Sequence, residues 1–287
     1  MTADLEWGLV PAVPVPFRGS TIDEQAQRDY ARWMAKQRVA GVAVWAHTGR
    51  GPHLSAAQRR VVIDTWRAAL PHKVIIAGAN SVEMADEAKR GGANALLAFP
   101  RRDAAVAYHE ALGRALPVIA FYLYEAAGGV NYDDATLHKI LSLPSVVGIK
   151  VATLDSVMTF QRIAAVMREH PDKLLITGED RFLGYSLMMG ARAALIGMGS
   201  ALTDMQAKLL DAKKNADDHA FLRLATQVDA FGAVTFTAPL EGYIRRMLWA
   251  LAADGVIPEE SCDDPWGPAL PEAERDAVRR AVREARA

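Results

Sequence analysis

The sequence predicts an α/β protein of the (β/α)8 class, a TIM barrel, followed by a helical appendix at its C-terminal end. Eight short apolar segments alternate with stretches of helical periodicity over about 200 residues, and the alternation stops after Gly197. A doubly wound open sheet is the main structural rival. The absence of a G-x-G-x-x-G motif after the first apolar segment weakens that rival without excluding it.

The eight apolar segments are predicted to be parallel strands. Each is short and is bounded by glycine, proline or polar residues, as expected for strands that are buried on both faces. The predicted strands are residues 9–15, 42–46, 74–77, 95–99, 118–122, 146–150, 174–177 and 193–197.

The intervals between these strands carry helical periodicity. Ser55, Ser81, Asp133 and Asp155 each precede such a stretch and are predicted N-caps, because their side chains can accept hydrogen bonds from the first turn. The predicted helices are residues 23–37, 55–70, 81–90, 104–116, 133–141, 155–169 and 180–189.

The chain beyond Gly197 is predicted to be helical throughout, over residues 201–216, 220–231, 239–253 and 272–286. The first of these helices would complete the barrel, and the others would form the appendix. We therefore predict a barrel with the catalytic site in residues 1–216 and a C-terminal helical bundle in residues 217–287, without an obvious flexible linker between them.

The composition excludes several classes of function. The chain of 287 residues carries 33 Lys and Arg against 34 Asp and Glu, a net charge of −1, so neither a nucleic-acid surface nor a membrane partner is expected. A single cysteine, Cys262, excludes an intramolecular disulfide and a multi-cysteine metal site, and is predicted to be inert packing. Neither metal-site spacing, a signal peptide nor an apolar run of ~18 residues is found, so we expect no metal, no cofactor and a cytoplasmic protein.

Lys150 is the strongest candidate for chemistry. The active site of a (β/α)8 barrel lies at the C-terminal ends of its strands, and of the nine lysines only Lys150 closes an apolar strand at that end. Burial among branched side chains lowers the pKa of an amine, and a neutral amine can attack a carbonyl carbon to form a Schiff base. A buried lysine that merely pairs with a carboxylate is the alternative.

Further polar candidates follow other predicted strands. Tyr122 ends the fifth strand and could move protons during imine chemistry, or could simply be a core aromatic. The loop A-H-T-G-R-G offers His47, Thr48 and Gly49, whose hydroxyl and backbone amides could cradle a carboxylate, although a simple turn is an equal alternative.

The last two strands of the barrel also end in candidates. After the seventh strand, T-G-E-D-R contains Gly178, which permits close approach of a ligand, and two acids that could bind hydroxyls, Glu179 and Asp180. Asp180 could instead cap the next helix. Gly197, which ends the eighth strand, completes the predicted substrate-binding set.

These motifs resemble those of the dihydrodipicolinate synthase and N-acetylneuraminate lyase family of Schiff-base aldolases, along nearly the whole chain. G-I-K at 148–150 matches the Schiff-base lysine motif, A-H-T-G-R resembles G-T/S-T-G-E, and G-E-D resembles G-D/F-D. The opening A-V-P-V-P-F resembles A-x-x-T-P-F, with Val15 in place of threonine. Tyr122 stands 28 residues before Lys150, as the family's catalytic tyrosine does. Counting from Pro117 would place Phe121 there, but a phenyl ring cannot transfer protons.

The resemblance implies an activity and an assembly. A 2-oxo acid such as pyruvate would form an imine on Lys150, Thr48 would hold its carboxylate, and Tyr122 would move the protons. The implied partners are a small 2-oxo acid, an aldehyde and further copies of the chain, commonly in a homotetramer. The apolar segments A-L-L-A-F-P and V-I-A-F-Y-L-Y are consistent with such an assembly.

The departures from the family narrow the expected substrate. The position of the synthase's substrate-binding arginine is Ala127, and A-F-P-R-R-D lacks the synthase's second tyrosine. Arg181 replaces an acidic residue of the sialic-acid lyases. A dianionic substrate would therefore need another cation, for which Arg50, Arg101 and Arg181 are the candidates.

Three main functions stay open at this stage, together with one further enzymatic alternative. The first is a lyase that cleaves a hydroxylated 2-oxo acid by a retro-aldol reaction, and the second is a dehydratase of a sugar-derived 2-oxo acid that uses the same imine. 4-Hydroxy-tetrahydrodipicolinate synthesis is a less favoured enzymatic alternative. The third is a non-catalytic binding protein for 2-oxo acids, against which the retention of Lys150 and Tyr122 argues.

Overall fold

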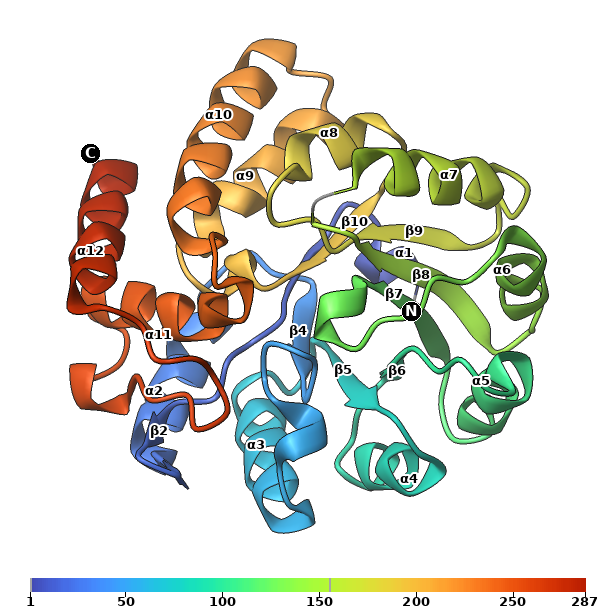
Figure 1. Ribbon diagram of the computed structural model, residues 1–287, viewed down its shortest axis with the longest axis horizontal. Helices are drawn as coiled ribbons and strands as arrows, with labels where there is room; N and C mark the ends of the chain where they lie inside the picture. The colour runs from blue at the N-terminus through green and yellow to red at the C-terminus, as the bar shows by residue number, and fades with distance from the viewer. Residues whose placement is uncertain (1, 155) are drawn as a thin grey trace.

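The barrel predicted from the sequence is confirmed. The structure, a computed structural model, describes residues 2–154 and 156–287. In this part of the chain, eight parallel strands form a sheet in the order β1-β10-β9-β8-β7-β6-β5-β4, and a bridge from Ala12 to Ala43 joins the two ends. Figure 1 shows these strands within a ring of helices. The strands are β1 (Leu9–Pro11), β4 (Gly41–Val44), β5 (Val74–Ala79), β6 (Ala95–Ala98), β7 (Val118–Leu123), β8 (Val146–Ala152), β9 (Leu174–Thr177) and β10 (Ala193–Ile196).

The helices of the barrel begin close to their predicted caps. Ser55 accepts a hydrogen bond from the amide of Gln58 and completes a capping box. Ser81 and Asp133 each accept a hydrogen bond from the first turn of their helices. Asp155 lies outside the described residues, and the described cap of the following helix is Ser156. The helices are α2 (Glu24–Ala35), α3 (Ala56–Ala69), α4 (Val82–Arg90), α5 (Ala105–Gly113), α6 (Asp134–Leu141), α7 (Val157–Arg168), α8 (Leu183–Met188) and α9 (Thr203–Lys214).

Three short elements near the N-terminus were not predicted. They are α1 (Thr2–Leu5) and the antiparallel pair β2 (Phe17–Arg18) and β3 (Thr21–Ile22). Segments of two to four residues are too short to carry a periodic pattern, which is why the sequence gives no signal for them.

Alternation along the strands divides the apolar side chains into two cores. One core fills the barrel interior and contains Ile119, Phe121 and Leu123 of β7 together with Ala152 of β8. The other lies between the strands and the helices and contains Tyr122 of β7 and Val151 of β8. Because side chains alternate with period two, the neighbours of an interior residue face the helices.

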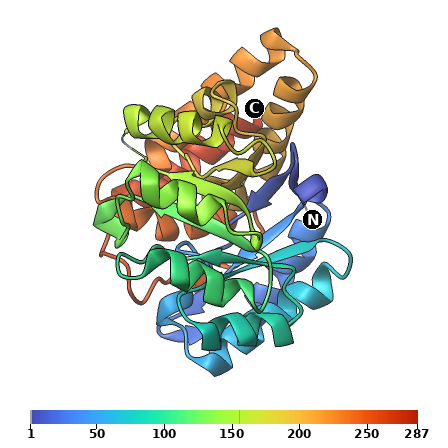
Figure 2. The same cartoon turned by 90° about the vertical axis from the view of Figure 1, so that its right-hand side faces the viewer.

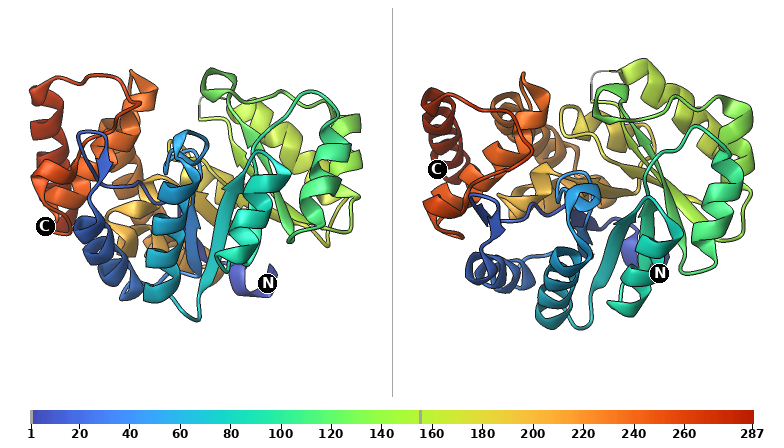
Figure 3. Two further views of the ribbon diagram at one scale, coloured as in Figure 1. Left: turned by 90° about the horizontal axis from the view of Figure 1, so that it is seen from below. Right: turned by 60° about the horizontal axis from the view of Figure 1, so that its bottom comes forward.

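The C-terminal segment is helical and packs against the barrel. Its elements are α10 (Asp218–Thr235), the 3-10 turn η4 (Leu240–Gly242), α11 (Tyr243–Ala253), the 3-10 turn η5 (Glu259–Ser261) and α12 (Glu272–Arg286). Helix α10 packs on α8 and α9, and α12 packs on α10 and α11 (Figure 1). In Figure 2 the red C-terminal helix lies on the far side of the molecule, behind the barrel. In Figure 3 this segment, in orange and red, rises at the same end of the barrel as the loop after β4. Among the described helices, none is long and apolar enough to span a membrane.

Candidate functional site

A cavity lies at the C-terminal ends of the strands. Six of the eight predicted site residues line it, from the ends of β4, β8, β9 and β10, as the (β/α)8 architecture requires. The lining residues are His47, Thr48, Phe121, Leu123, Tyr124, Lys150, Ala152, Leu154, Gly178, Asp180, Gly197, Phe236 and Tyr243.

Lys150 is buried in the barrel interior, with an exposed fraction of 5%. Its Nζ lies 4.3 Å from the centroid of the Phe121 ring, its neighbour in the register of β7 and β8. No carboxylate among the described residues forms an ion pair with this amine. Burial lowers the pKa of Lys150 to about 8, although the negative charges of Asp180 and Glu179 oppose that shift. A substantial share of the amine is therefore neutral near physiological pH.

The two acids after β9 have different surroundings. Burial raises the pKa of Asp180 to about 7, against hydrogen bonds from the amides of Met198 and Gly197 and the charge of Lys150. Asp180 lines the cavity, and the N-cap of α8 is Phe182, so Asp180 does not cap that helix. The carboxylate of Glu179 accepts hydrogen bonds from Thr153 and Leu154 and thereby anchors the loop after β8. Its oxygens are occupied by the protein's own backbone and hydroxyl groups rather than turned to the cavity.

The prediction that the Tyr122 phenol lies at this mouth is wrong. Strand β7 places Phe121 and Leu123 inside the barrel, so Tyr122 between them faces the helices. Its hydroxyl donates to Asn131 at 2.6 Å and accepts from Arg162 at 3.3 Å. The tyrosine of this segment that lines the cavity is instead Tyr124, which directly follows β7.

The loop after β4 contributes His47 and Thr48 to the cavity. The hydroxyl of Thr48 is within 2.9 Å of the Tyr243 hydroxyl, and among the described residues no acceptor takes a hydrogen bond from the Thr48 amide. Gly49 does not line the cavity. A Cβ at this position would lie 2.9 Å from the carbonyl oxygen of Val13, so Gly49 allows the loop to pack against the segment that follows β1.

Two glycines make space for functional side chains. A Cβ on Gly178 would lie 2.5 Å from Cε of Lys150, and a Cβ on Gly197 would lie 2.9 Å from the Tyr243 ring. The close approach expected of Gly178 is thus to the lysine itself. Any larger residue at either position would displace the group that it faces.

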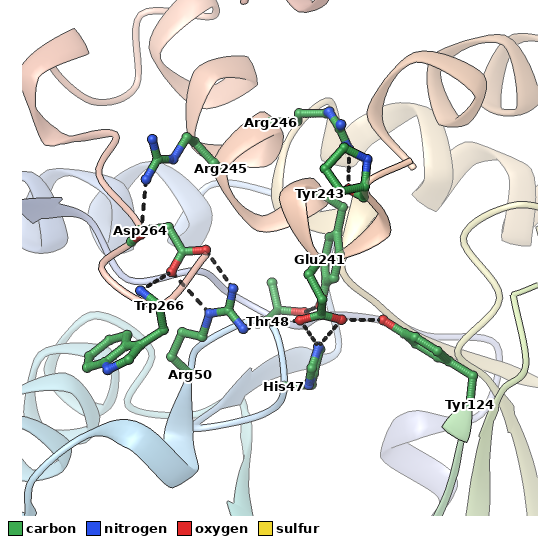
Figure 4. A network of polar contacts seen from close by, with 11 residues as sticks. His47, Thr48, Arg50, Tyr124, Glu241, Tyr243, Arg245, Arg246, Asp264 and Trp266 are labelled. Atoms are coloured by element: carbon green, nitrogen blue, oxygen red, sulfur yellow. Dashed lines mark hydrogen bonds and ion pairs between the residues drawn. The ribbon is translucent and has the colours of Figure 1, made fainter. Parts of the chain in front are cut away.

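The C-terminal segment adds residues that the sequence did not indicate. Phe236 and Tyr243 line the cavity, and the carboxylate of Glu241 contacts His47 and Tyr124 (Figure 4). These residues are almost 200 positions from the loop they contact, and no motif marks them. Tyr243 begins α11, and a tyrosine at a helix start carries no signal of function.

Each arginine expected to provide a cation is engaged elsewhere. Arg50 donates two hydrogen bonds to Asp264, at 2.7 and 3.1 Å, and one to Glu241 at 3.2 Å. Arg181 donates to the carbonyl of Phe236, and the Arg101 guanidinium lies over the Tyr108 ring. None of the three lines the cavity. Among the described residues that line it, Lys150 is the only lysine or arginine.

Neither a cluster of metal ligands nor a reactive thiol is found among the described residues. In residues 2–154 and 156–287, no cluster of three His, Cys, Asp or Glu side chains is placed to hold a metal ion. Cys262 is buried in the C-terminal segment, and burial raises the pKa of its thiol to about 12. It is packing, as predicted.

Comparisons with known proteins agree with this geometry. The model of the dihydrodipicolinate synthetase family matches residues 6–285. A 4-hydroxy-tetrahydrodipicolinate synthase from Rhodospirillum centenum is 28% identical over 227 residues, covering 73% of this chain and 76% of the relative. N-acetylneuraminate lyase 2 from Escherichia coli is 23% identical over 278 residues, covering 91% and 88%.

Solved structures of similar proteins share the fold. N-acetylneuraminate lyase from Fusobacterium nucleatum, solved in complex with pyruvate, has a TM-score of 0.83 at 18% identity, covering 98% of this chain and 97% of that one. A catalytic lysine mutant of the Ruminococcus gnavus sialic acid aldolase has a TM-score of 0.86 at 17% identity, covering 100% and 98%. At these identities the likeness shows the barrel and its C-terminal helices, and leaves the substrate open.

Proposed function

Since the chain belongs to the dihydrodipicolinate synthetase family, whose members are lyases of the aldolase type, we propose that it cleaves or forms a carbon–carbon bond of a 2-oxo acid through an imine on Lys150. The observation that carries this proposal is the Lys150 amine. It is buried at the C-terminal end of β8, faces the cavity, and has a pKa of about 8.

The first steps follow from the groups around that amine. Neutral Lys150 attacks the ketone carbon of the 2-oxo acid, and loss of water from the adduct gives a protonated imine. Asp180, buried beside the amine, provides a negative charge that stabilises this cation. The free amide and the hydroxyl of Thr48 provide donors for the carboxylate of the 2-oxo acid.

The protonated imine then makes cleavage of the C3–C4 bond easier, because it can accept the electrons of that bond. When a base removes the proton of a hydroxyl on C4, the C3–C4 bond breaks and its electrons move through C2 to the imine nitrogen. The products of this step are an aldehyde and an enamine on Lys150. Protonation of the enamine at C3 and hydrolysis release pyruvate and restore the amine.

The cavity disfavours a second carboxylate on the substrate. Because Arg50, Arg101 and Arg181 are engaged elsewhere, a dianionic substrate would bury an unpaired negative charge, which costs several kcal/mol. The apolar side chains of Leu123, Leu154 and Phe236 favour a neutral remainder instead. We therefore propose a hydroxylated 2-oxo acid with one carboxylate, and little synthesis of dihydrodipicolinate precursors from pyruvate and aspartate semialdehyde.

A coupled assay tests this function. A panel of 4-hydroxy-2-oxo acids is incubated with the wild-type protein and with Lys150→Ala, and pyruvate is measured through lactate dehydrogenase. Release of pyruvate by the wild type alone is the expected result. Consumption of an oxo acid without pyruvate would assign the dehydratase reaction instead. Equal behaviour of the two proteins on every compound would contradict the proposal.

A further inference from the structure

Glu241 of the C-terminal segment joins two side chains that lie at the cavity. Its carboxylate oxygens lie 3.1 Å from Nε2 of His47, and one of them accepts a hydrogen bond from the Tyr124 hydroxyl at 2.7 Å. Arg50 donates to the same carboxylate at 3.2 Å (Figure 4). Turn η4, the loop after β4 and the end of β7 therefore meet at this one group.

The ionisation of Glu241 determines which nitrogen of His47 carries hydrogen. Burial alone would raise the pKa of Glu241, but hydrogen bonds from His47 and Tyr124 and the charge of Arg50 lower it to about 2. The group is then an ionised carboxylate, which can only accept hydrogen bonds. His47 must donate to it through Nε2–H, so Nδ1 of the neutral ring keeps a lone pair. Among the described residues, no donor contacts that nitrogen.

The two phenols at the cavity are less suited to accept a proton, and Asp180 already has a role beside Lys150. Burial raises the pKa of Tyr124 and of Tyr243 far above the neutral range, so both phenols remain protonated. The interior position opposite Lys150, where a phenol could act, is occupied by Phe121. Asp180 already accepts hydrogen bonds from two backbone amides and lies beside the lysine as its counter-charge.

We infer that His47 transfers the protons of the reaction through Nδ1, and that Glu241 is the positioning residue that fixes its tautomer and orientation. This inference rests on the imine mechanism proposed above. A carboxylate that orients an imidazole and stabilises its protonated form is a known arrangement in acid–base catalysis. Here the carboxylate comes from the C-terminal segment and not from the barrel.

The step can be observed on pyruvate alone, without knowledge of the natural substrate. In the imine of pyruvate, Nδ1 of His47 takes a proton from the C3 methyl group, and the C–H electrons form the C2=C3 bond while the imine nitrogen becomes neutral. The imidazolium exchanges its proton with solvent and returns a deuteron to C3 in D2O. Loss of the methyl signal in proton NMR therefore measures proton transfer, and borohydride trapping measures imine formation separately.

Both measurements are made on the wild type and on four variants. We expect His47→Asn to lower the exchange rate by about 100-fold or more, and Glu241→Gln by about 10- to 100-fold, while trapping stays within about threefold of wild type. The double variant should exchange no more slowly than His47→Asn, because Glu241 acts through His47. Glu260→Gln, the same change on an exposed side chain of the same segment, should match the wild type.

The results separate this inference from the function on which it rests. Absence of trapping in the wild type would overturn the imine mechanism itself. Trapping together with unchanged exchange in His47→Asn would overturn the role of His47 and leave the imine intact. Additive losses in the double variant would overturn the role of Glu241. Circular dichroism tests whether each variant is folded. If His47→Asn does not fold, Glu241→Gln still tests whether Glu241 and His47 act together in proton transfer.

Discussion

The Lys150 amine is neutral far more often than that of an ordinary lysine. With a pKa of about 8, about one amine in ten is neutral at pH 7, compared with fewer than about one in a thousand at the usual pKa of 10.4. Its neutral form increases as pH rises through 8. We therefore predict that the rate of imine formation with pyruvate rises from pH 6 to pH 9, with a midpoint near 8. Stopped-flow or quenched trapping measures this rate, and a rate still climbing steeply above pH 10 would contradict the lowered pKa.

Tyr122 and Tyr124 differ in the direction of their hydroxyl groups. Since the Tyr122 phenol bonds Asn131 and faces the helices, Tyr122→Phe should leave turnover within about threefold of wild type. Loss of that hydrogen bond should lower the free energy of unfolding by about 1 kcal/mol. Steady-state kinetics and urea unfolding measure the two effects. A loss of turnover of 100-fold or more would restore Tyr122 as a catalytic residue.

At the scale of the elements, strand β7 shows why one site residue was misplaced. The apolar segment predicts the strand correctly, but every second residue faces the interior, so a shift of one residue exchanges Phe121 and Tyr122. Spacing from Lys150 and chemical suitability both indicated Tyr122. The register between β7 and β8 shifts between Val118 and Ile119, which the sequence does not reveal.

Site residues that are placed by their own strand could be predicted from the sequence, whereas site residues that are placed by contacts between distant elements could not. Lys150 and Asp180 were identified because each lies within three residues of the C-terminal end of its own strand, where barrel chemistry occurs. Glu241 belongs to the three-residue turn η4, and Tyr243 begins α11 directly after it. Their role depends on how the C-terminal segment folds back on the loop after β4, which no local pattern determines.

A buried ion pair fixes that segment to the loop after β4. Arg50 and Asp264 form two hydrogen bonds, with side chains only 7% and 2% exposed. Asp264→Asn removes the more buried of the two carboxylates that compensate Arg50, so we predict a loss of about 3 kcal/mol in the free energy of unfolding. Glu260→Gln, which affects only an exposed ion pair with Arg18, should change it by less than about 0.5 kcal/mol. Urea unfolding measures both, and equal effects would contradict the structural role of the pair.

At the scale of the whole molecule, the residues to which the proposed reaction assigns roles, Lys150, Thr48, Asp180 and His47, meet at one cavity of a single chain. The apolar segments A-L-L-A-F-P and V-I-A-F-Y-L-Y contain the buried barrel strands β6 and β7. Their apolar side chains are used within the chain and do not support assembly of several copies. The exposed apolar side chains Val157 and Met158 at the start of α7 are available for contact between copies. The expected homotetramer thus remains a prediction that rests on the family.

This arrangement predicts how activity depends on assembly. If the protein is a homotetramer at micromolar concentration, dilution until it dissociates should leave the activity per chain within about twofold, because Lys150, Thr48, Asp180 and His47 all come together within one chain. Light scattering coupled to size-exclusion chromatography gives the mass, and assays at matched concentrations give the activity. Loss of activity in step with dissociation would show that a partner subunit contributes to the site.

The most direct measurement of the central claim is the identity of the residue that forms the imine. The protein is incubated with pyruvate, reduced with borohydride, digested and analysed by mass spectrometry, with Lys150→Arg treated in parallel. The account predicts a reduced pyruvyl adduct on Lys150 in the wild type and none in the variant. An adduct on another of the nine lysines, or no adduct with pyruvate or any related 2-oxo acid, would contradict it.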